Sequence, residues 1–322
     1  MKYVFVILAA LLVDLLISDP PWLPHPVRFL GRVIAFFERL IRRLGKNRII
    51  LTAGGTVIAV ILPVAIYLMV EQALAVLYGM NREVGILCEV YLLSTAIALK
   101  GLATAAQAVR RPLAEGSLSS ARERVGEIVG RETAHLDTEG VTKAAVESVA
   151  ENTVDAVVAP LFFAFIGGAP LALAYRTVNT LDSMIGYPHG DYRYLGWASA
   201  RLDDLLNYLP ARLTGALFVM AAFLRGGDWR RVWRMLRRDA RKHPSPNSGI
   251  PEAAMAGYLG VELGGACRYR GVVILRPGIG ERVVGLEPGH IHAAVKMLYT
   301  VAALAVLLGS VFRLLGERLT GG

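Results

Sequence analysis

Four apolar stretches of this chain are each long enough to cross a lipid bilayer. They occupy residues 49–78, 84–109, 205–224 and 294–315, and a crossing helix needs about 20 predominantly apolar residues. Apolar residues make up 54% of the 322 positions and charged residues only 19%, against about a quarter in ordinary soluble domains. This composition excludes a disordered chain, a coiled coil and a nucleic-acid-binding tail. The sequence therefore predicts an all-α, polytopic membrane protein with no nucleic-acid partner.

Two further apolar runs are less regular. Residues 3–17 are short and contain Asp14, with one lysine before them and no small-residue cleavage site, so we interpret them as a retained first span. Residues 154–175 are interrupted by Gly167-Gly168-Ala169-Pro170, which favours a turn between helices. This run is either one crossing or a hairpin of two half-length helices. The total is about five to six membrane helices.

The remaining chain forms a small soluble segment. We divide the protein into a membrane core with the polar clusters (residues 1–242), a soluble segment (243–289) and a C-terminal membrane helix (290–322). Within the soluble segment a short helix is predicted at 252–259. Residues 268–275 and 281–286, separated by 276–280, have the pattern of a β-hairpin. Cys88 and Cys267 lie far apart without C-x-x-C spacing, so neither a disulfide framework nor a zinc ribbon is supported.

Basic residues indicate the orientation. Residues 28–48, 110–143 and 230–242 are rich in arginine and lysine, as cytoplasmic loops of membrane proteins are, so we expect a multi-pass protein of the cell (cytoplasmic) membrane. All three stretches face the cytoplasm only if residues 154–175 cross once. A hairpin keeps residues 176–204 on the cytoplasmic side but moves 230–242 to the far side, unless 205–224 is irregular.

Three carboxylates precede the broken run at helical spacing. On a helix, Glu147, Glu151 and Asp155 fall within an arc of about 80°, with Ser148 and Asn152 on its flank. Carboxylates gathered at an apolar span repel one another and are costly to desolvate, and a cation removes this cost. Oxygen ligands of this kind suit Mg²⁺, which usually keeps positions for water and phosphate.

Two more polar clusters follow within the next stretch of chain. The members of the second cluster share an arc of about 120° on a helix; they are Arg176, Asn179, Asp182 and Ser183. The third cluster leads into the next span and has Asp203 beside it; its members are Arg201, Asp204, Asn207 and Tyr208. Acids, amides and arginines together indicate phosphate and metal chemistry at a membrane surface. No G-x-x-x-x-G-K-[ST] phosphate cradle is present, so arginines and metal must hold any nucleotide phosphates.

Several polar and proline-containing blocks are informative when they are taken together. They are Asp19-Pro20 with Pro24-His-Pro26, Glu147-Ser-Val-Ala-Glu-Asn-Thr-Val-Asp155, Ala159-Pro-Leu-Phe162, Tyr175-Arg-Thr-Val-Asn-Thr-Leu-Asp-Ser-Met184, Ala200-Arg-Leu-Asp-Asp204 with Asn207 and Pro210-Ala-Arg212, and His243-Pro-Ser-Pro-Asn247. In this order they carry a resemblance to the adenosylcobinamide-phosphate synthase family of cobalamin biosynthesis. It implies an integral membrane enzyme that joins a propionate of the corrin adenosylcobyric acid to (R)-1-amino-2-propanol phosphate, or to aminopropanol, giving adenosylcobinamide (phosphate). The family's reaction is an ATP-dependent amide ligation. Other late cobalamin-pathway membrane enzymes are candidate partners besides the lipid bilayer.

Residue roles are assigned from the chemistry of such a ligation. A metal ion and arginine neutralise a phosphate as charge develops on it. The guanidinium group of arginine binds phosphate or carboxylate in bidentate fashion. A carboxylate of raised pKa accepts the amine proton. The predicted metal ligands are Glu151, Asp155 and Asp182; the predicted catalytic residues are Glu147, Asp204 and Arg176; and the predicted substrate-binding residues are Arg131, Asn152, Asn179, Ser183, Arg201, Asn207, Ser245, Asn247 and His25.

Two other functions compete with the ligase. One is a Mg²⁺-dependent membrane transferase that acts on a diphosphate substrate, which predicts an apolar cavity and no need for ATP. The other is a secondary transporter with a broken helix at residues 167–170, which predicts two related halves, and no such symmetry is evident in the sequence.

The ligase leads to a prediction about geometry. If one Mg²⁺ is shared, an antiparallel hairpin with its open end toward the cytoplasm brings the Asp155 and Asp182 carboxylates within about 8 Å of each other. A straight helix from Val154 to Met184 separates them by roughly 40 Å.

Overall fold

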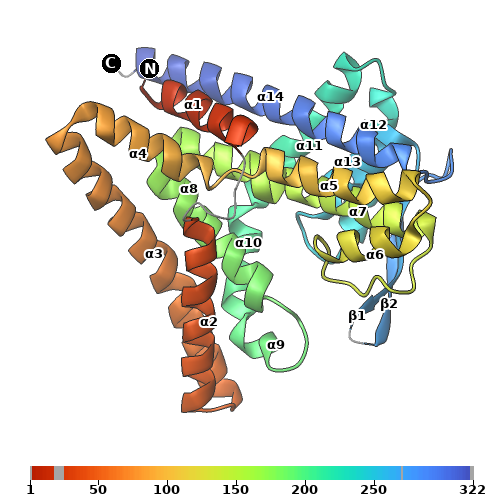
Figure 1. Cartoon of the computed structure of the whole chain (residues 1–322), viewed down its shortest axis with the longest axis horizontal. Coiled ribbons are helices and arrows are strands. Elements are labelled where there is room, and N and C mark those ends of the chain that lie inside the picture. Colours follow the sequence, from red (N-terminus) through yellow and green to blue (C-terminus); the bar gives the residue numbers. More distant parts are fainter. Residues whose placement is uncertain (1, 18–24, 270, 320–322) are drawn as a thin grey trace. The chain divides into compact units, whose positions relative to one another are not determined.

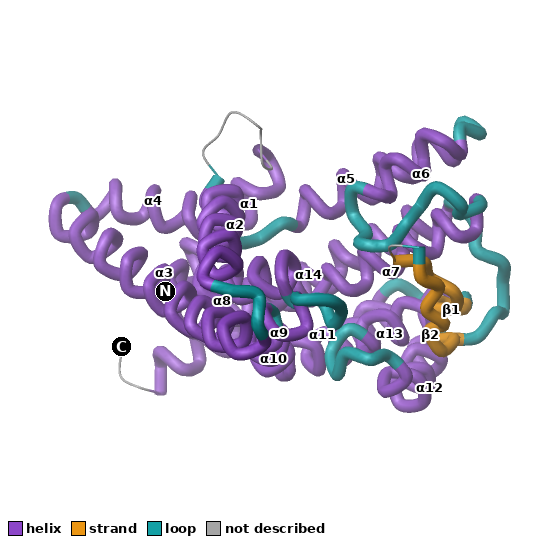
Figure 2. Tube along the Cα trace, turned by 90° about the horizontal axis from the view of Figure 1, so that it is seen from below, coloured by secondary structure: helices purple, strands orange, loops and turns teal. Residues whose placement is uncertain are grey.

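The computed structural model describes residues 2–17, 25–269 and 271–319 and is built almost entirely of helices (Figures 1 and 2). The chain divides into two compact units. Unit 1 comprises Met1–Ala98, Ala159–Asn207 and Leu308–Gly322, and unit 2 comprises Leu99–Val158 and Tyr208–Leu307.

Unit 1 contains seven of the described helices and the end of an eighth. They are α1 (Lys2–Ile17), α2 (Pro26–Leu44), α3 (Arg48–Met80), α4 (Arg82–Ser94), α8 (Ala159–Ile185), α9 (Tyr192–Leu195), α10 (Trp197–Leu206) and the C-terminal part of α14 (Gly289–Leu319). α2, α3, α8 and α9 enclose an apolar core that includes Ile34, Leu51, Leu181 and Leu195. Asn47 caps α3 by accepting a hydrogen bond from the Ile50 N–H at 2.8 Å, which satisfies one of the free amides of a helix start.

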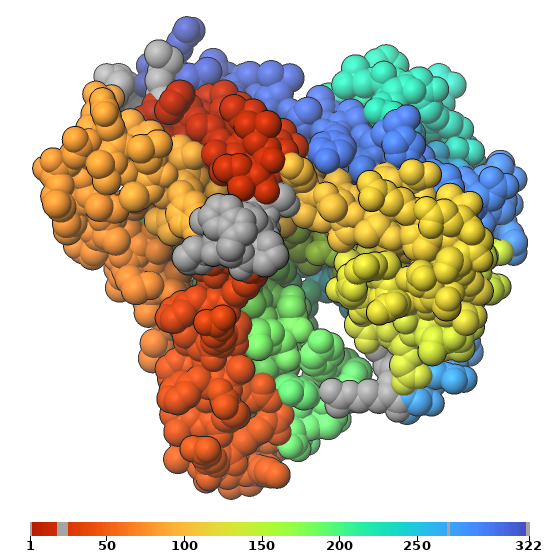
Figure 3. All heavy atoms as spheres, viewed as in Figure 1, coloured from red at the N-terminus to blue at the C-terminus, as the bar shows by residue number. Residues whose placement is uncertain are grey.

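Unit 2 combines helices with the sole sheet of the described chain. Its elements are α5 (Leu99–Ala114), α6 (Leu118–Gly126), α7 (Thr138–Thr153), the π-helix η1 (Val154–Val158), α11 (Tyr208–Leu224), α12 (Trp229–Asp239), the 3₁₀-helix η2 (Ala240–Lys242), α13 (Gly249–Leu259), β1 (Glu262–Tyr269), β2 (Val272–Gly280) and most of α14. In the space-filling view α5 and α6, in yellow, form one continuous packed surface (Figure 3).

The predicted membrane helices are present. Among the described residues, Arg48–Met80, Arg82–Ala114, Thr138–Ile185 and Gly289–Leu319 are long and apolar enough to cross a bilayer, and α10 with α11 makes a fifth if this bent pair is one span. The chain is thus a polytopic, mostly α-helical membrane protein. The predicted span at 205–224 is interrupted at Asn207, where α10 ends and α11 begins. Residues 3–17 form a helix, and their crossing of the bilayer stays a prediction.

The predicted Gly-Pro break is present as a kink within α8. Gly167 (φ −137°, ψ 24°) and Gly168 (φ 65°, ψ −158°) leave the helical conformation. The rings of Phe163 and Tyr175, which flank the break, stack with their centroids 4.9 Å apart. Twelve residues of straight helix would separate them by roughly 18 Å. The break is therefore confirmed and a straight helix through this run is excluded, while the antiparallel arrangement of the two halves stays a prediction.

The predicted β-hairpin exists, but its strand limits were wrong. β1 and β2 pair antiparallel from Glu262↔Gly280 to Tyr269↔Val272, so the predicted turn at 276–280 lies inside β2 and residues 281–286 are not a strand. A β-bulge between Leu263 and Gly265 lies opposite Pro277 and Gly278. A two-stranded sheet has only edge strands, which tolerate proline, especially at a bulge. Proline was thus a misleading sign of the turn.

Candidate functional site

Unit 2 holds a buried carboxylate, Glu147, on α7. Asp137 starts this helix by accepting a hydrogen bond from the Gly140 N–H at 2.7 Å. The Glu147 side chain is 3% exposed and forms an ion pair with Arg131, and its Oε1 accepts from the Gly264 N–H of β1 at 2.6 Å. Arg131 also donates to Sγ of Cys267 at 3.2 Å. Both oxygens of Glu147 are therefore occupied, so this residue holds the β-hairpin on α7 and is poorly placed to act as a base.

One helical turn further on, Glu151 faces the start of α13. Its Oε1 accepts from the Ser248 hydroxyl at 3.0 Å. Asn152 donates to the Ser148 carbonyl at 2.9 Å. Asp155 then falls in the π-helix η1, so it leaves the regular α-helical phase that placed it on one face with Glu147 and Glu151. Single π-helical turns within α-helices are rare and occur frequently at functional sites.

A glutamate that the sequence analysis did not select lies at the centre of this cluster. Glu252 on α13 is 2% exposed, and its Oε1 is 3.8 Å from Nε2 of His243. Burial raises the pKa of Glu252 well above its usual range, and the charges of Glu147 and Glu151 raise it further. Burial also lowers the pKa of His243. Both groups are thus driven toward their neutral forms, which is how a proton-transferring pair is prepared near neutral pH.

The signal for Glu252 was present in the sequence. It is the sole charged residue in Gly249–Leu259, and an isolated acid in an apolar helix is costly unless it has a partner or a function. We missed it because its partners come from residues distant in the chain, including Arg131 and Arg276, whose positive charges oppose the rise of its pKa.

The turn before α13 is held by its own hydrogen bonds. The N–H groups of Asn247 and Ser248 donate to the Ser245 hydroxyl at 3.2 and 3.3 Å, and the Ser245 N–H donates to Nδ1 of His243 at 3.0 Å. Arg212 donates to Oδ1 of Asn247 at 3.1 Å. These amides are engaged within the turn, so the predicted role of Ser245 and Asn247 in holding a phosphate relies on other atoms of the turn.

Unit 1 holds a second, separate polar network. Tyr175 donates to Oδ1 of Asn207 at 2.9 Å, and Asn207 donates to Oδ2 of Asp203 at 3.0 Å. Asn179 donates to Oδ1 of Asp203 at 3.3 Å and accepts from Arg176 at 3.0 Å. The structure thus brings together Arg176, Asn179 and Asn207 as predicted, with Asp203 in place of Asp204. The i,i+4 spacing of Asp203 and Asn207 was the sequence signal for this pair.

The remaining predicted residues also belong to unit 1. Asp182 lies on α8 next to Gly186, and a Cβ added to Gly186 would be 1.9 Å from Oδ1 of Asp182. Ser183 donates to the Asn179 carbonyl at 2.9 Å. Arg201 is exposed. His25 precedes α2 as its N-cap residue, and Asp19 to Pro24 lie outside the described residues.

The shared metal site stays a prediction, because Asp155 belongs to unit 2 and Asp182 to unit 1. Within the described part of the chain, no three His, Cys, Asp or Glu side chains gather as ligands of one metal ion.

Comparison with known proteins gives the family. A sequence model described as CobD/Cbib protein matches residues 7–298. Cobalamin biosynthesis protein CobD of Geobacter metallireducens is 46% identical over 309 residues, covering 95% of this chain and 95% of that protein. CobD of Klebsiella pneumoniae is 44% identical over 299 residues, covering 93% and 94%, and CbiB of Salmonella paratyphi A is 43% identical over 300 residues, covering 93% and 94%. No solved structure matches significantly. With its membrane helices and its match over most of its length, the chain belongs to the CobD/CbiB family of cobalamin biosynthesis proteins.

Proposed function

We propose that this protein is an ATP-dependent ligase of the cytoplasmic membrane. It forms the amide between a propionate of adenosylcobyric acid and (R)-1-amino-2-propanol phosphate or aminopropanol. Membership of a cobalamin biosynthesis family supports the pathway. The neutral Glu252–His243 pair next to Glu147 and Glu151 supports acid–base chemistry at this site.

The reaction needs two bond changes. A propionate oxygen attacks the γ-phosphorus of ATP, the bond to ADP breaks, and an acyl phosphate forms. The amine nitrogen then attacks the acyl carbon, the carbon–oxygen bond to phosphate breaks, and inorganic phosphate leaves. The ammonium must lose one proton before it can attack and a second as the amide forms.

We assign proton removal to Glu252 with His243 behind it. A carboxylate of raised pKa, in its ionised form, accepts the amine proton near neutral pH. Because Nδ1 of His243 accepts from the Ser245 N–H, the neutral imidazole carries its proton on Nε2, which faces Oε1 of Glu252 and orients the carboxylate. Arg276 and Arg131, whose charges act on Glu252, favour binding of the propionate and of phosphate at the same place. This replaces Glu147 as the proposed base.

Magnesium fits the oxygen donors of this cluster. Glu151, Asp155 and the Ser248 hydroxyl offer only oxygen, and Glu151 and Ser248 already contact each other. Mg²⁺ is commonly held by one or two carboxylates together with substrate phosphates, so a set of three protein acids is not needed. When bound, the ion would neutralise charge on the ATP phosphates.

The test is turnover by purified protein in lipid nanodiscs, supplied with adenosylcobyric acid, ATP, Mg²⁺ and either amine. We expect adenosylcobinamide (phosphate) by mass spectrometry together with one ADP per product. Glu252→Gln should lower kcat at least about 100-fold, as expected for loss of general acid–base catalysis. The matched control is Glu139→Gln, because Glu139 is 39% exposed and pairs with Arg282, which is 63% exposed. This control should not lower kcat. Product formation without ATP, or full activity of Glu252→Gln, would refute the proposal.

A further inference from the structure

Unit 2 carries a concave groove beside the carboxylate cluster, with which it shares His243. This groove has a volume of about 730 Å³ and lies between α11, α12, η2 and the turn before α13. Arginine and apolar side chains of these elements line it, together with His243 and Ser245. It has room for a ligand far larger than a phosphate ion.

The charge of this groove has one sign. Arg212, Arg237 and Arg241 line it, and no acidic side chain does. Among the residues that the structure describes, Arg237 and Arg241 have no hydrogen-bond or ion-pair partner, and both are exposed. Such a groove concentrates anions because its positive charges are not neutralised from within the protein.

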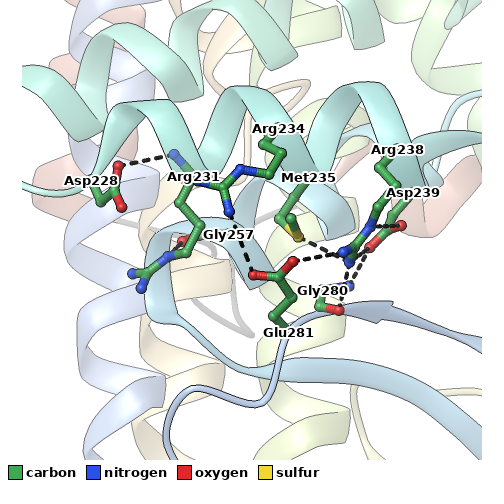
Figure 4. A network of polar contacts seen from close by, with 9 residues as sticks. All are labelled: Asp228, Arg231, Arg234, Met235, Arg238, Asp239, Gly257, Gly280 and Glu281. Carbon is green, nitrogen blue, oxygen red and sulfur yellow. Dashed lines mark hydrogen bonds and ion pairs between the residues drawn. The ribbon is translucent and has the colours of Figure 1, made fainter.

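Three other arginines of α12, none of which lines the groove, have partners within the unit. Arg238 donates to Glu281 at 2.6 Å and to Asp239 at 2.7 Å, and Arg234 lies 3.9 Å from Glu281. Arg231 donates to the Gly257 carbonyl at 2.6 Å. Figure 4 shows these three side chains, with their partners on α12, α13 and the end of β2. The paired face of α12 therefore holds the unit together, and the groove face is left for a ligand.

One part of the groove is apolar and leads toward an apolar helix surface. Ala216, Leu236 and Ile250 line it beside Trp233, whose side chain is 50% exposed. Tryptophan and arginine are the side chains that favour the headgroup level of a bilayer. α11 belongs to a candidate membrane span, and its Phe223 and Leu224 are 64% and 60% exposed.

We infer that this groove binds the headgroup of an acidic phospholipid from the surrounding bilayer. The phosphate lies between Arg212, Arg237 and Arg241, and the glycerol and first acyl carbons lie on Trp233 and Leu236. A soluble phosphate would satisfy the arginines but would leave the apolar lining exposed to water. The inference does not depend on the proposed ligase activity.

The experiment uses Trp233 as the reporter. The chain has 4 tryptophans, and Trp22→Phe, Trp197→Phe and Trp229→Phe leave Trp233 alone. The protein is placed in phosphatidylcholine nanodiscs with a minor fraction of either brominated phosphatidylglycerol or brominated phosphatidylcholine, and quenching is compared. We expect preferential quenching by phosphatidylglycerol. The paired substitution Arg237→Gln with Arg241→Gln should reduce this preference about 10- to 30-fold, since each arginine near a membrane surface contributes about 1 kcal/mol.

The control is Arg230→Gln on the same helix, because Arg230 does not line the groove; it should leave the preference unchanged. Equal quenching by the two lipids would overturn the inference. Displacement of phosphatidylglycerol by millimolar glycerol 3-phosphate or inorganic phosphate would also overturn it, because the groove would then recognise a free phosphate.

Discussion

The ion pair between Arg131 and Glu147 gives a prediction of stability. Arg131→Met keeps the length of the side chain but leaves Glu147 charged, 3% exposed and bonded only to the Gly264 N–H at 2.6 Å. Removing one partner of a buried ion pair costs about 3–5 kcal/mol, because the remaining charge is buried without compensation. We expect a loss of this size in the free energy of opening the β-hairpin away from α7.

Cys267 reports this opening directly. It is 2% exposed on β1 and contacts Arg131, and Cys88→Ser removes the other thiol. Under conditions in which the hairpin opens and closes faster than the thiol reacts, the labelling rate follows the open population. A cost of about 3–5 kcal/mol should accelerate maleimide labelling of Cys267 by about 100- to 4,000-fold.

Two variants isolate the cause. Arg124→Met removes an arginine whose ion pair with Glu127 is more than half exposed, and such pairs contribute about 0–1 kcal/mol, so labelling should barely change. Arg131→Met with Glu147→Gln removes both charges but keeps an oxygen for the Gly264 N–H, so most of the protection should return. If Arg131→Met labels within threefold of its parent, or the double variant labels as fast as the single one, the cost does not come from an unpaired buried charge.

Three further predictions follow from the structure. The pKa of Glu252 in the folded protein is raised above its ordinary value of 4.5. The contribution of Glu252 to stability is therefore complete below pH 4.5 and is lost as the pH rises through the raised pKa. Thermal melts at a series of pH values should show this loss relative to Glu252→Gln. Gly168→Ala should destabilise the protein by about 1–3 kcal/mol, because its backbone conformation is open almost only to glycine and a Cβ would be 2.9 Å from Glu89. Gly79→Ala, with nothing within 4 Å of the added atom, is its control in the same melt. Asp155→Asn should leave the protein folded but inactive and less responsive to Mg²⁺, and wild-type turnover at saturating Mg²⁺ would exclude Asp155 as a ligand.

The membrane helices and the break in α8 could be predicted because their signals are local. A crossing helix must carry its apolar residues consecutively, and Gly167-Gly168-Ala169-Pro170 combines a residue that permits positive φ with one that starts helices. The β-hairpin was located but misregistered. Its turn includes Gly271 with φ 80°, and the more conspicuous Pro277-Gly278 lies in the strand.

The sites were harder to predict because their contacts join distant segments. Glu147 was interpreted as a base on its helical face, yet Arg131 and an amide of β1 occupy it. Glu252 was missed because its chemistry depends on burial and on neighbours that no local pattern reveals. By contrast, Asn179 and Asn207 were expected to lie together and do so through Asp203, since they belong to polar blocks close together in the chain; their substrate-binding role stays a prediction.

The hydrogen bond from Gly264 to Glu147 is made by the main chain, and this affects how the contact can be detected. No side chain at position 264 takes part, so covariation between the two positions would not reveal it. A substitution scan would rank Gly264 as sensitive for another reason: its φ is 80°, and any Cβ would lie 2.4 Å from the Pro277 carbonyl oxygen. Replacing the amide between residues 263 and 264 by an ester removes the N–H and leaves every side chain in place. Backbone chemistry is thus the direct way to measure how firmly the hairpin is attached to α7.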